Sequence, residues 1–144
     1  MFNVHVHYST VQCLSSSSFV HALQVRDGTV RRIAKHCPQL ERLALANCAS
    51  LTDAAVAELA TYVRAIGALD MSNCRLLGNR GVGALAAHCT ALNTLDVSST
   101  AVDSHGYCKM QVAFSAPIMI LIHNCSIIDN SHLIFTLNKF KYEI

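Results

Sequence analysis

Cysteine and histidine side chains are the groups in this chain that could carry chemistry beyond structure. The 144 residues include seven cysteines and eight histidines. Cys48 and Cys74 stand 26 residues apart, at the same place in two rows of a repeating pattern, so they could form a redox pair or hold a metal ion. No C-x-x-C spacing, which would support a metal site, accompanies them. We therefore predict that both sulfurs are buried in the core, with Thr100 as their polar counterpart in the next row.

The histidines offer two further arrangements. His5 and His7 would lie on one face of an extended segment and form the more metal-like pair, but two ligands alone make a weak site. His36 and His88 each precede a cysteine, two rows apart, which is too far for one set of ligands. We expect them at solvent-facing helix ends, where an imidazole suits the helix C-terminus. The sequence therefore predicts no metal site and no cofactor.

Catalysis finds little support in these residues. A cysteine could act as a nucleophile with a histidine as its base, but each candidate residue already has a structural place in the repeating pattern. No glycine-rich phosphate loop is present, because Gly78, Gly81 and Gly83 fall in a repeat turn and at the start of a helix. We therefore predict that the chain is not an enzyme and has no catalytic residues.

The pattern that holds these residues is L-x-x-L-x-L-x-x-C-x-x-L, repeated with a period of 26 residues and followed each time by a helical stretch. This period lies in the range of roughly 20–29 residues that is typical of leucine-rich repeats. Leu43 and Leu45 alternate as in a strand. Helical spacing follows at Val30–Cys37, Val56–Val63 and Val82–Cys89. We predict an α/β fold, a leucine-rich-repeat solenoid of about four to five repeats. Its parallel strands would line a concave face and its helices a convex face.

Short polar residues precede each helical stretch in one column of the repeat. Asp27, Asp53 and Asn79 occupy this column, and Asp103 or Ser104 follows. Side chains of these types can accept hydrogen bonds from the free N–H groups of a first helical turn. We therefore predict that each of them caps its own helix.

The repeats divide the chain into three parts. Residues 1–13 form an N-terminal edge segment, in which His5–Tyr8 could be a strand, and residues 14–107 form the repeats, beginning with a degenerate one that contains Ser17 and Phe19. The third part is residues 108–144. There Ile120 and Ile122 follow Leu95 and Val97 in order, with Cys125, Ile128 and Asn130 behind them. The composition changes in this part, so it is either a degenerate repeat or cap, or an unrelated tail.

Net charge and hydropathy indicate which classes of partner and which cellular location we expect. The formal net charge is only +2, which offers no electrostatic case for a nucleic-acid partner. Hydrophobic residues make up 52% of the chain, so we expect surface that is covered by further repeats or by a partner. The longest apolar run, Val112–Ile122, contains Ser115 and Pro117 and is too short to span a bilayer. We find no secretion signal, and we therefore predict reduced cysteines, no membrane association, and a location in the cytoplasm, the nucleus or both.

The rows resemble the cysteine-containing subclass of leucine-rich repeats known from F-box/leucine-rich-repeat proteins. The resemblance covers about residues 14–107 and is carried by Cys37-Pro38, Cys48, Leu51-Thr52-Asp53, Leu59-Ala60 and Leu69–Cys74. Antagonist-of-mitotic-exit-like proteins carry similar repeats. The resemblance implies a protein–protein interaction module of the kind that holds substrates for an SCF-type ubiquitin ligase.

The resemblance stops short of the F-box. There is no Leu-Pro opening, no run of alternating Leu and Ile helices at the start, and no Trp. A ligase core would therefore be reached only through an F-box that this chain lacks. The alternative is a stand-alone adaptor or inhibitor with no ubiquitin role. Either function implies a protein partner, as a substrate or as a regulatory target.

The candidate partner-binding residues lie between the core leucines, where side chains would point to the concave face. They are Arg42, Asp70, Ser72, Thr94, Asp96 and Ser98. Asp70 and Asp96 would be stacked like charges, which repel. This pair indicates either a basic group on a partner or local hydrogen bonding within the repeat.

Overall fold

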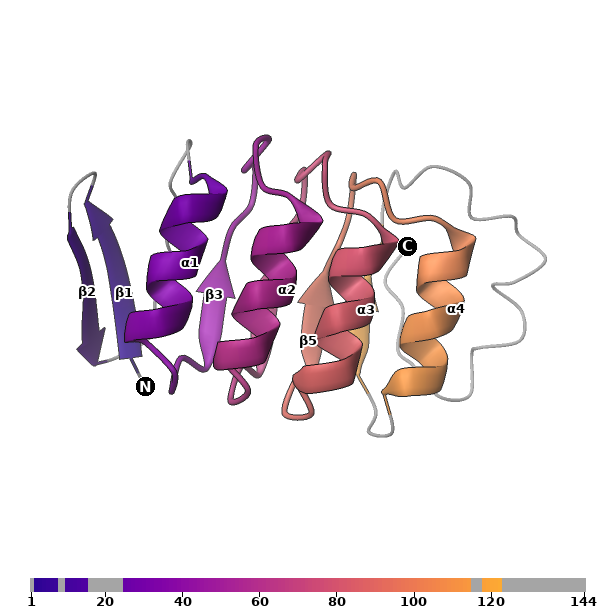
Figure 1. Ribbon diagram of the computed structural model, residues 1–144. Helices are drawn as coiled ribbons and strands as arrows, with labels where there is room; N and C mark the ends of the chain where they lie inside the picture. Colours follow the sequence, from indigo (N-terminus) through magenta and orange to yellow (C-terminus); the bar gives the residue numbers. More distant parts are fainter. Residues whose placement is uncertain (1, 8–9, 16–24, 115–117, 123–144) are drawn as a thin grey trace.

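The computed structural model describes residues 2–7, 10–15, 25–114 and 118–122 (Figure 1). An antiparallel hairpin comes first, and helices and short strands then alternate. In chain order the elements are β1 (Phe2–His7), β2 (Thr10–Ser15), α1 (Asp27–His36), β3 (Arg42–Ala44), α2 (Asp53–Tyr62), β4 (Ala68–Asp70), α3 (Asn79–His88), β5 (Thr94–Asp96), α4 (Ser104–Ala113) and β6 (Met119–Leu121).

Strands β3, β4, β5 and β6 form one parallel sheet in chain order. Leu43 lies opposite Leu69, Leu69 opposite Leu95, and Leu95 opposite Ile120, which gives offsets of 26, 26 and 25 residues. Parallel neighbours need a crossover connection, and a helix supplies it in each step. The described chain is therefore α/β, with four parallel strands in one sheet and four helices, and is compatible with a repeat solenoid.

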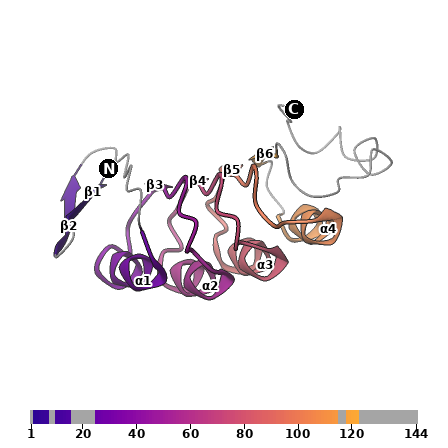
Figure 2. The same cartoon turned by 90° about the horizontal axis from the view of Figure 1, so that it is seen from above.

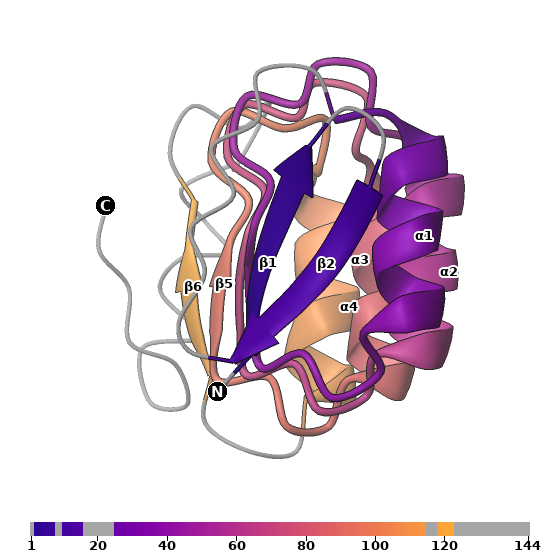
Figure 3. The same ribbon diagram turned by 90° about the vertical axis from the view of Figure 1, so that its left-hand side faces the viewer.

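The helices and the strands form two rows. Figure 2 shows helices α1 to α4 along the outer side of a shallow arc and strands β3 to β6 along the inner side. Figure 3, which looks along the rows, shows the strands on one side and the helices on the other. We call the side of β3–β6 that faces away from the helices the sheet face.

The core lies between the two rows and consists of the apolar residues that recur with the repeat. The residues with helical spacing are buried as predicted: Val30, Ile33 and Ala34 in α1, Val56, Leu59 and Ala60 in α2, and Val82, Leu85 and Ala86 in α3. Burying a Val, Leu or Ile side chain contributes roughly 1.5–3 kcal/mol. The core continues without a break from Val25 to Ile120, so neighbouring units cover one another.

A left-handed residue turns the chain after each of three strands. Asn47, Asn73 and Ser99 have φ values of 65°, 60° and 55°. Asparagine adopts this conformation more readily than most residues. In this geometry the N–H of Asn47 donates to the carbonyl of Ser72, and the N–H of Asn73 to that of Ser98, each at 2.8 Å. The hydrogen-bond ladder thus continues past the ends of the strands.

The prediction that Asp27, Asp53 and Asn79 cap their own helices is wrong. The cap residues of α1, α2 and α3 are Arg26, Thr52 and Gly78, and none of these helices has a side-chain cap hydrogen bond. The prediction is confirmed for Asp103, whose carboxylate accepts hydrogen bonds from the N–H groups of His105 and Gly106 at the start of α4.

The three polar side chains instead join each unit to the next. The carboxylate of Asp27 accepts hydrogen bonds from the N–H and the hydroxyl of Thr52 at 2.9 and 2.6 Å. Asp53 accepts from the N–H of Gly78 at 2.7 Å. The amide of Asn79 donates to Asp103 at 2.7 Å and accepts from its N–H at 3.1 Å. Helix starts lie side by side, so a short side chain there reaches the neighbouring unit. We call these contacts the helix-start ladder.

The two ends of the chain are described in part. Of the predicted strand His5–Tyr8, His5–His7 lie in β1, which pairs antiparallel with β2, and Tyr8 lies outside the described residues. The predicted boundaries between the three parts, after residues 13 and 107, fall inside strand β2 and inside helix α4. Ile120 lies opposite Leu95, and Ile122 packs against the core. The remaining predicted repeat positions lie outside the described residues: Ser17, Phe19, Cys125, Ile128 and Asn130.

Candidate functional site

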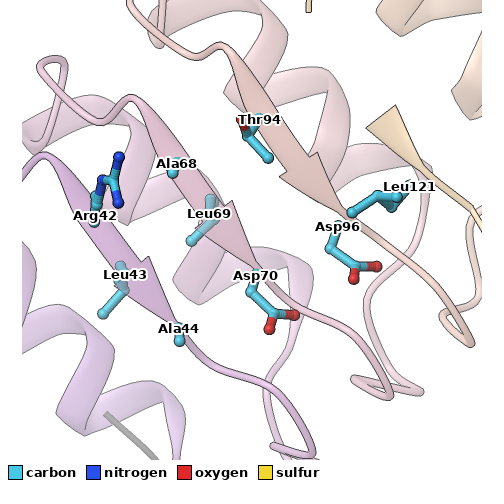
Figure 4. A pocket seen from close by; sticks show the side chains of 9 residues that line it. All are labelled: Arg42, Leu43, Ala44, Ala68, Leu69, Asp70, Thr94, Asp96 and Leu121. Carbon is cyan, nitrogen blue, oxygen red and sulfur yellow. The ribbon is translucent and has the colours of Figure 1, made fainter. Parts of the chain in front are cut away.

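Two rows of side chains cross the strands on the sheet face. The register aligns Arg42, Ala68 and Thr94 in the first row. The second row contains Ala44, Asp70, Asp96 and Leu121. Together with Leu43 and Leu69 these residues line a hollow of about 230 Å³ (Figure 4).

Small residues create this hollow. Ala44 and Ala68 each occupy a row position where the neighbouring strands carry longer side chains, such as Arg42, Asp70 and Thr94. Leu43 and Leu69, each 2% exposed, reach the bottom of the hollow. Its lining is therefore mostly apolar, with charged groups at the margin.

Asp70 and Asp96 each make a local hydrogen bond. In each carboxylate, Oδ1 accepts the N–H of the residue two positions later, Ser72 or Ser98, at 2.9 Å. These bonds order the chain just before the left-handed turn residues Asn73 and Ser99. The prediction of local hydrogen bonding is confirmed. Among the described residues, Oδ2 of neither carboxylate accepts a hydrogen bond.

The charges around the hollow do not pair with one another. Asp70 and Asp96 are register partners on adjacent strands, which lie about 4.8 Å apart in such sheets. Within the described chain, the ion pairs are Arg31–Glu58 at 2.7 Å and Lys35–Glu58 at 4.0 Å. Both are on the helix side, so neither Arg42 nor the two aspartates belongs to an ion pair there.

The hollow contains four of the six predicted partner-binding residues: Arg42, Asp70, Thr94 and Asp96. Ser72 and Ser98 lie beyond the strand ends and act on the two aspartates through their N–H groups, and Ser98 is only 8% exposed. Three lining residues of the two rows were not among the candidates: Ala44, Ala68 and Leu121. They occupy the same columns of the repeat as the candidates, so the repeat register could have identified them as lining residues.

Cys48 and Cys74 lie in the core, as predicted. They are 1% and 0% exposed, and neither forms a disulfide. The Cys74 thiol donates to the carbonyl oxygen of Leu45 at 3.1 Å and lies next to the Cys48 sulfur. The contact with Cys48, together with burial, raises the pKa of the Cys74 thiol, and the same contact lowers the pKa of Cys48. Thr100, in the next unit, donates its hydroxyl to the carbonyl of Val97 at 2.7 Å.

The other two repeat cysteines differ from each other. Cys89 carries a free buried thiol, and burial raises its pKa to about 11. Cys37 is disulfide-bonded, so the prediction of a reduced thiol at this position is wrong. Column position in a repeat predicts burial of a sulfur, which is correct for Cys37 at 4% exposure, but it does not reveal whether a second sulfur lies within bonding reach.

No group of three potential metal ligands occurs among the residues that the structure describes. His36 and His88 end helices α1 and α3 and are exposed there, as predicted. Within the same residues no helix has both the length and the apolar character needed to cross a bilayer.

Comparison with known proteins identifies the fold. No protein-family model matches this chain, and no curated protein matches it in sequence. Thirteen solved chains match it in structure. One, described as "Leiomodin-1 Actin-Binding Site 2 (ABS2)", has a TM-score of 0.64 and 15% identity over 85% of this chain and 82% of its own. The chain therefore shares its fold with this leiomodin-1 structure, and the comparisons assign it to no family.

Proposed function

We propose that this chain is a protein-interaction module, built as a leucine-rich-repeat solenoid, that binds a partner protein through its sheet face. The observation that carries the proposal is the hollow that crosses neighbouring strands on the face opposite the helices. An apolar floor with charged groups at the margin is a common arrangement at binding sites. We propose a binding role rather than a catalytic one, because the sequence assigns each candidate nucleophile a place in the repeating pattern.

Two observations support the solenoid. Corresponding residues of neighbouring strands are 26, 26 and 25 residues apart, within the range of roughly 20–29 typical of leucine-rich repeats. Each unit consists of one short strand and one helix of ten residues, and the same columns are buried in each.

The resemblance to F-box/leucine-rich-repeat proteins supports a substrate-recognition role of the SCF type. In that role the sheet face would hold a protein substrate in the cytoplasm or nucleus, and an F-box would dock the ligase core. Because this sequence shows no F-box motif, the alternative is a stand-alone adaptor or inhibitor that binds its partner without any ligase.

Filling the hollow tests the proposed binding surface. Ala68→Leu places a longer side chain in the lining of the hollow, and Ala87→Leu is the matched control on the exposed side of α3. Partners captured from cells would be quantified by mass spectrometry and then measured with purified proteins by calorimetry. We expect Ala68→Leu to weaken binding at least about tenfold, which is about 1.4 kcal/mol. Equal binding by wild type and both variants, with unchanged melting curves, would rule out the hollow.

Co-purification distinguishes the two roles. A ligase receptor should recover the ligase core together with its substrate, whereas a stand-alone adaptor should recover the partner alone. Actin is a useful comparison protein, since the leiomodin-1 structure is described as an actin-binding site. At 15% identity that similarity concerns the fold, so actin is not the partner we propose.

A further inference from the structure

The hollow carries opposite charges at its two ends. Figure 4 shows the carboxylates of Asp70 and Asp96 next to each other at one end and the guanidinium of Arg42 at the other. The register agrees, because Arg42 belongs to the first row of side chains and the two aspartates to the second. A ligand that lies along the hollow would therefore meet negative charge at one end and positive charge at the other.

The negative end has unused bonding capacity. Oδ1 of each carboxylate accepts an N–H from Ser72 or Ser98, which holds the carboxylate in place. Within the described chain, the two Oδ2 atoms accept no hydrogen bond and no cation pairs with either group. Like charges directly opposite each other on adjacent strands are destabilising. A cation placed between them would relieve the repulsion and form charge-assisted hydrogen bonds with both.

The space beside the carboxylates suits an aliphatic chain. Leu43 and Leu69 form its floor, and Ala44 and Ala68 leave it open. Lysine and arginine side chains lay their methylene groups on apolar surface and keep the charged end in polar surroundings. An acidic or phosphorylated side chain would be repelled by both aspartates. A divalent metal ion usually needs more oxygen ligands than two carboxylates offer.

We propose that the hollow receives a lysine or arginine side chain of the partner protein, with its methylene groups over Leu69 and Ala68 and its charged end between Asp70 and Asp96. This inference rests on the proposed function, in which the sheet face is the binding surface. Arg42 disfavours a second cation at the opposite end. A carboxylate or carbonyl group of the partner fits there, and this fixes the direction in which the partner segment lies.

Short peptides provide a defined probe. The protein would be titrated with acetyl-Ala-Ala-X-Ala-Ala-amide, where X is arginine, lysine, norleucine or glutamate, and backbone amide shifts would be followed by NMR. We expect the arginine and lysine peptides to shift Leu69, Asp70, Leu95 and Asp96, with binding that weakens as salt is added. The norleucine peptide, which has a similar aliphatic chain without the charge, should bind at least about tenfold more weakly. The glutamate peptide should not shift these amides.

The double variant Asp70→Asn, Asp96→Asn isolates the charge. Each asparagine retains an Oδ1 that can accept the N–H of Ser72 or Ser98, so the local turn can persist. Glu41→Gln, at an exposed position just before β3, is the matched control for loss of a carboxylate. We expect the double variant to reduce binding of the cationic peptides at least about tenfold and the control to leave it unchanged.

The results separate this inference from the proposed function. The inference is overturned if norleucine binds as well as lysine and arginine, if the double variant binds the cationic peptides normally, or if no peptide shifts the sheet-face amides. In each case the proposed function is still judged by the partner protein. It stands if Ala68→Leu weakens partner binding, and it fails if Ala68→Leu does not.

Discussion

Gly81 lies directly against the carboxylate of Asp53: a Cβ at position 81 would come within 2.7 Å of Asp53 Oδ1 and 2.5 Å of Leu77 Cδ1. Asp53 uses that Oδ1 to accept the N–H of Gly78 in the helix-start ladder. Leu77 is fully buried and has little room to move. The glycine therefore leaves space for a contact between two units.

Gly81→Ala should destabilise the protein by about 1–3 kcal/mol, because the added methyl group must displace Asp53 or Leu77. Gly83 lies two residues later in the same helix, and a Cβ there would meet no atom within 4 Å. Gly83→Ala should instead stabilise the protein by up to about 1 kcal/mol, since alanine favours helix. Urea denaturation of both variants measures the difference. A gain in stability for Gly81→Ala would contradict the close approach to Asp53.

The helix-start ladder can be tested at Asp53. Asp53→Ala removes the acceptor of the Gly78 N–H and should cost about 1–3 kcal/mol, because that donor is left unsatisfied. Asp53→Asn keeps an acceptor oxygen and should cost less. The free energy of unfolding, measured in urea for both variants, shows which substitution costs more stability. Equal losses would mean that packing rather than the hydrogen bond determines the contribution of this residue.

The free thiols should react in the order of their exposure. Cys108 is half-buried, in a hollow between α3 and α4, whereas Cys48, Cys74 and Cys89 are at most 1% exposed. Iodoacetamide at neutral pH should therefore label Cys108 first and the three buried thiols only when the chain opens. Peptide mass spectrometry over a time course records this order. Early labelling of Cys74 would contradict its burial beneath the sheet.

Buried thiols should make the protein sensitive to alkaline pH. Burial raises the pKa of Cys89 to about 11, so the unfolded chain releases this proton first as the pH rises. The stabilising contribution is fully present below the ordinary thiol pKa of about 8.5 and is lost as the pH rises towards 11. The free energy of unfolding should therefore decline over this window, and less steeply in Cys89→Ala. Parallel slopes for the two proteins would show that Cys89 does not contribute.

Asp103 should act at the acidic end of the pH range. Hydrogen bonds from the N–H of Gly106 and from Asn79 hold its pKa below the ordinary value. A lowered pKa stabilises the fold above the ordinary aspartate value of about 4, and this contribution is lost as the pH falls below it. Helix α4 should therefore loosen on acidification, and Asp103→Asn should reduce the effect. Hydrogen exchange of the Tyr107 and Met110 amides, measured between pH 6 and 3, should quicken in the wild type as the pH falls and change less in the variant. Equal changes in the two proteins would contradict this role of Asp103.

Apolar periodicity predicted helices α1, α2 and α3 and the parallel strands, but it did not predict the antiparallel strand β2. The alternation at Leu43 and Leu45 and the helical spacing from Val56 to Val63 each record which side of an element is buried, and burial has the same period as the secondary structure. The one-residue shortening before Ile120 could also be read from the sequence, because a lost residue displaces a whole column.

Contacts between units could not be predicted in the same way. Aspartate is a residue type that often caps helices, so the sequence alone assigns Asp53 to its own helix. Only the position of the neighbouring unit brings its side chain to the N–H of Gly78. The disulfide of Cys37 likewise depends on a distance that no column records. The columns did predict Arg42, Asp70, Thr94 and Asp96 as surface residues. They did not predict a hollow, because its floor belongs to Leu43 and Leu69, which the pattern assigns to the core.

The stacking of each unit on its sequence neighbours also determines how the chain can reach this structure. Within the repeats, the principal contacts join α1 with α2, α2 with α3, α3 with α4, and each strand from β3 to β6 with the next. Every one of these steps closes a loop of similar length, so the conformational search does not grow as the row extends. Folding can therefore begin at any adjacent pair and spread in both directions. Damage to one central junction would divide the row into two pieces that open independently.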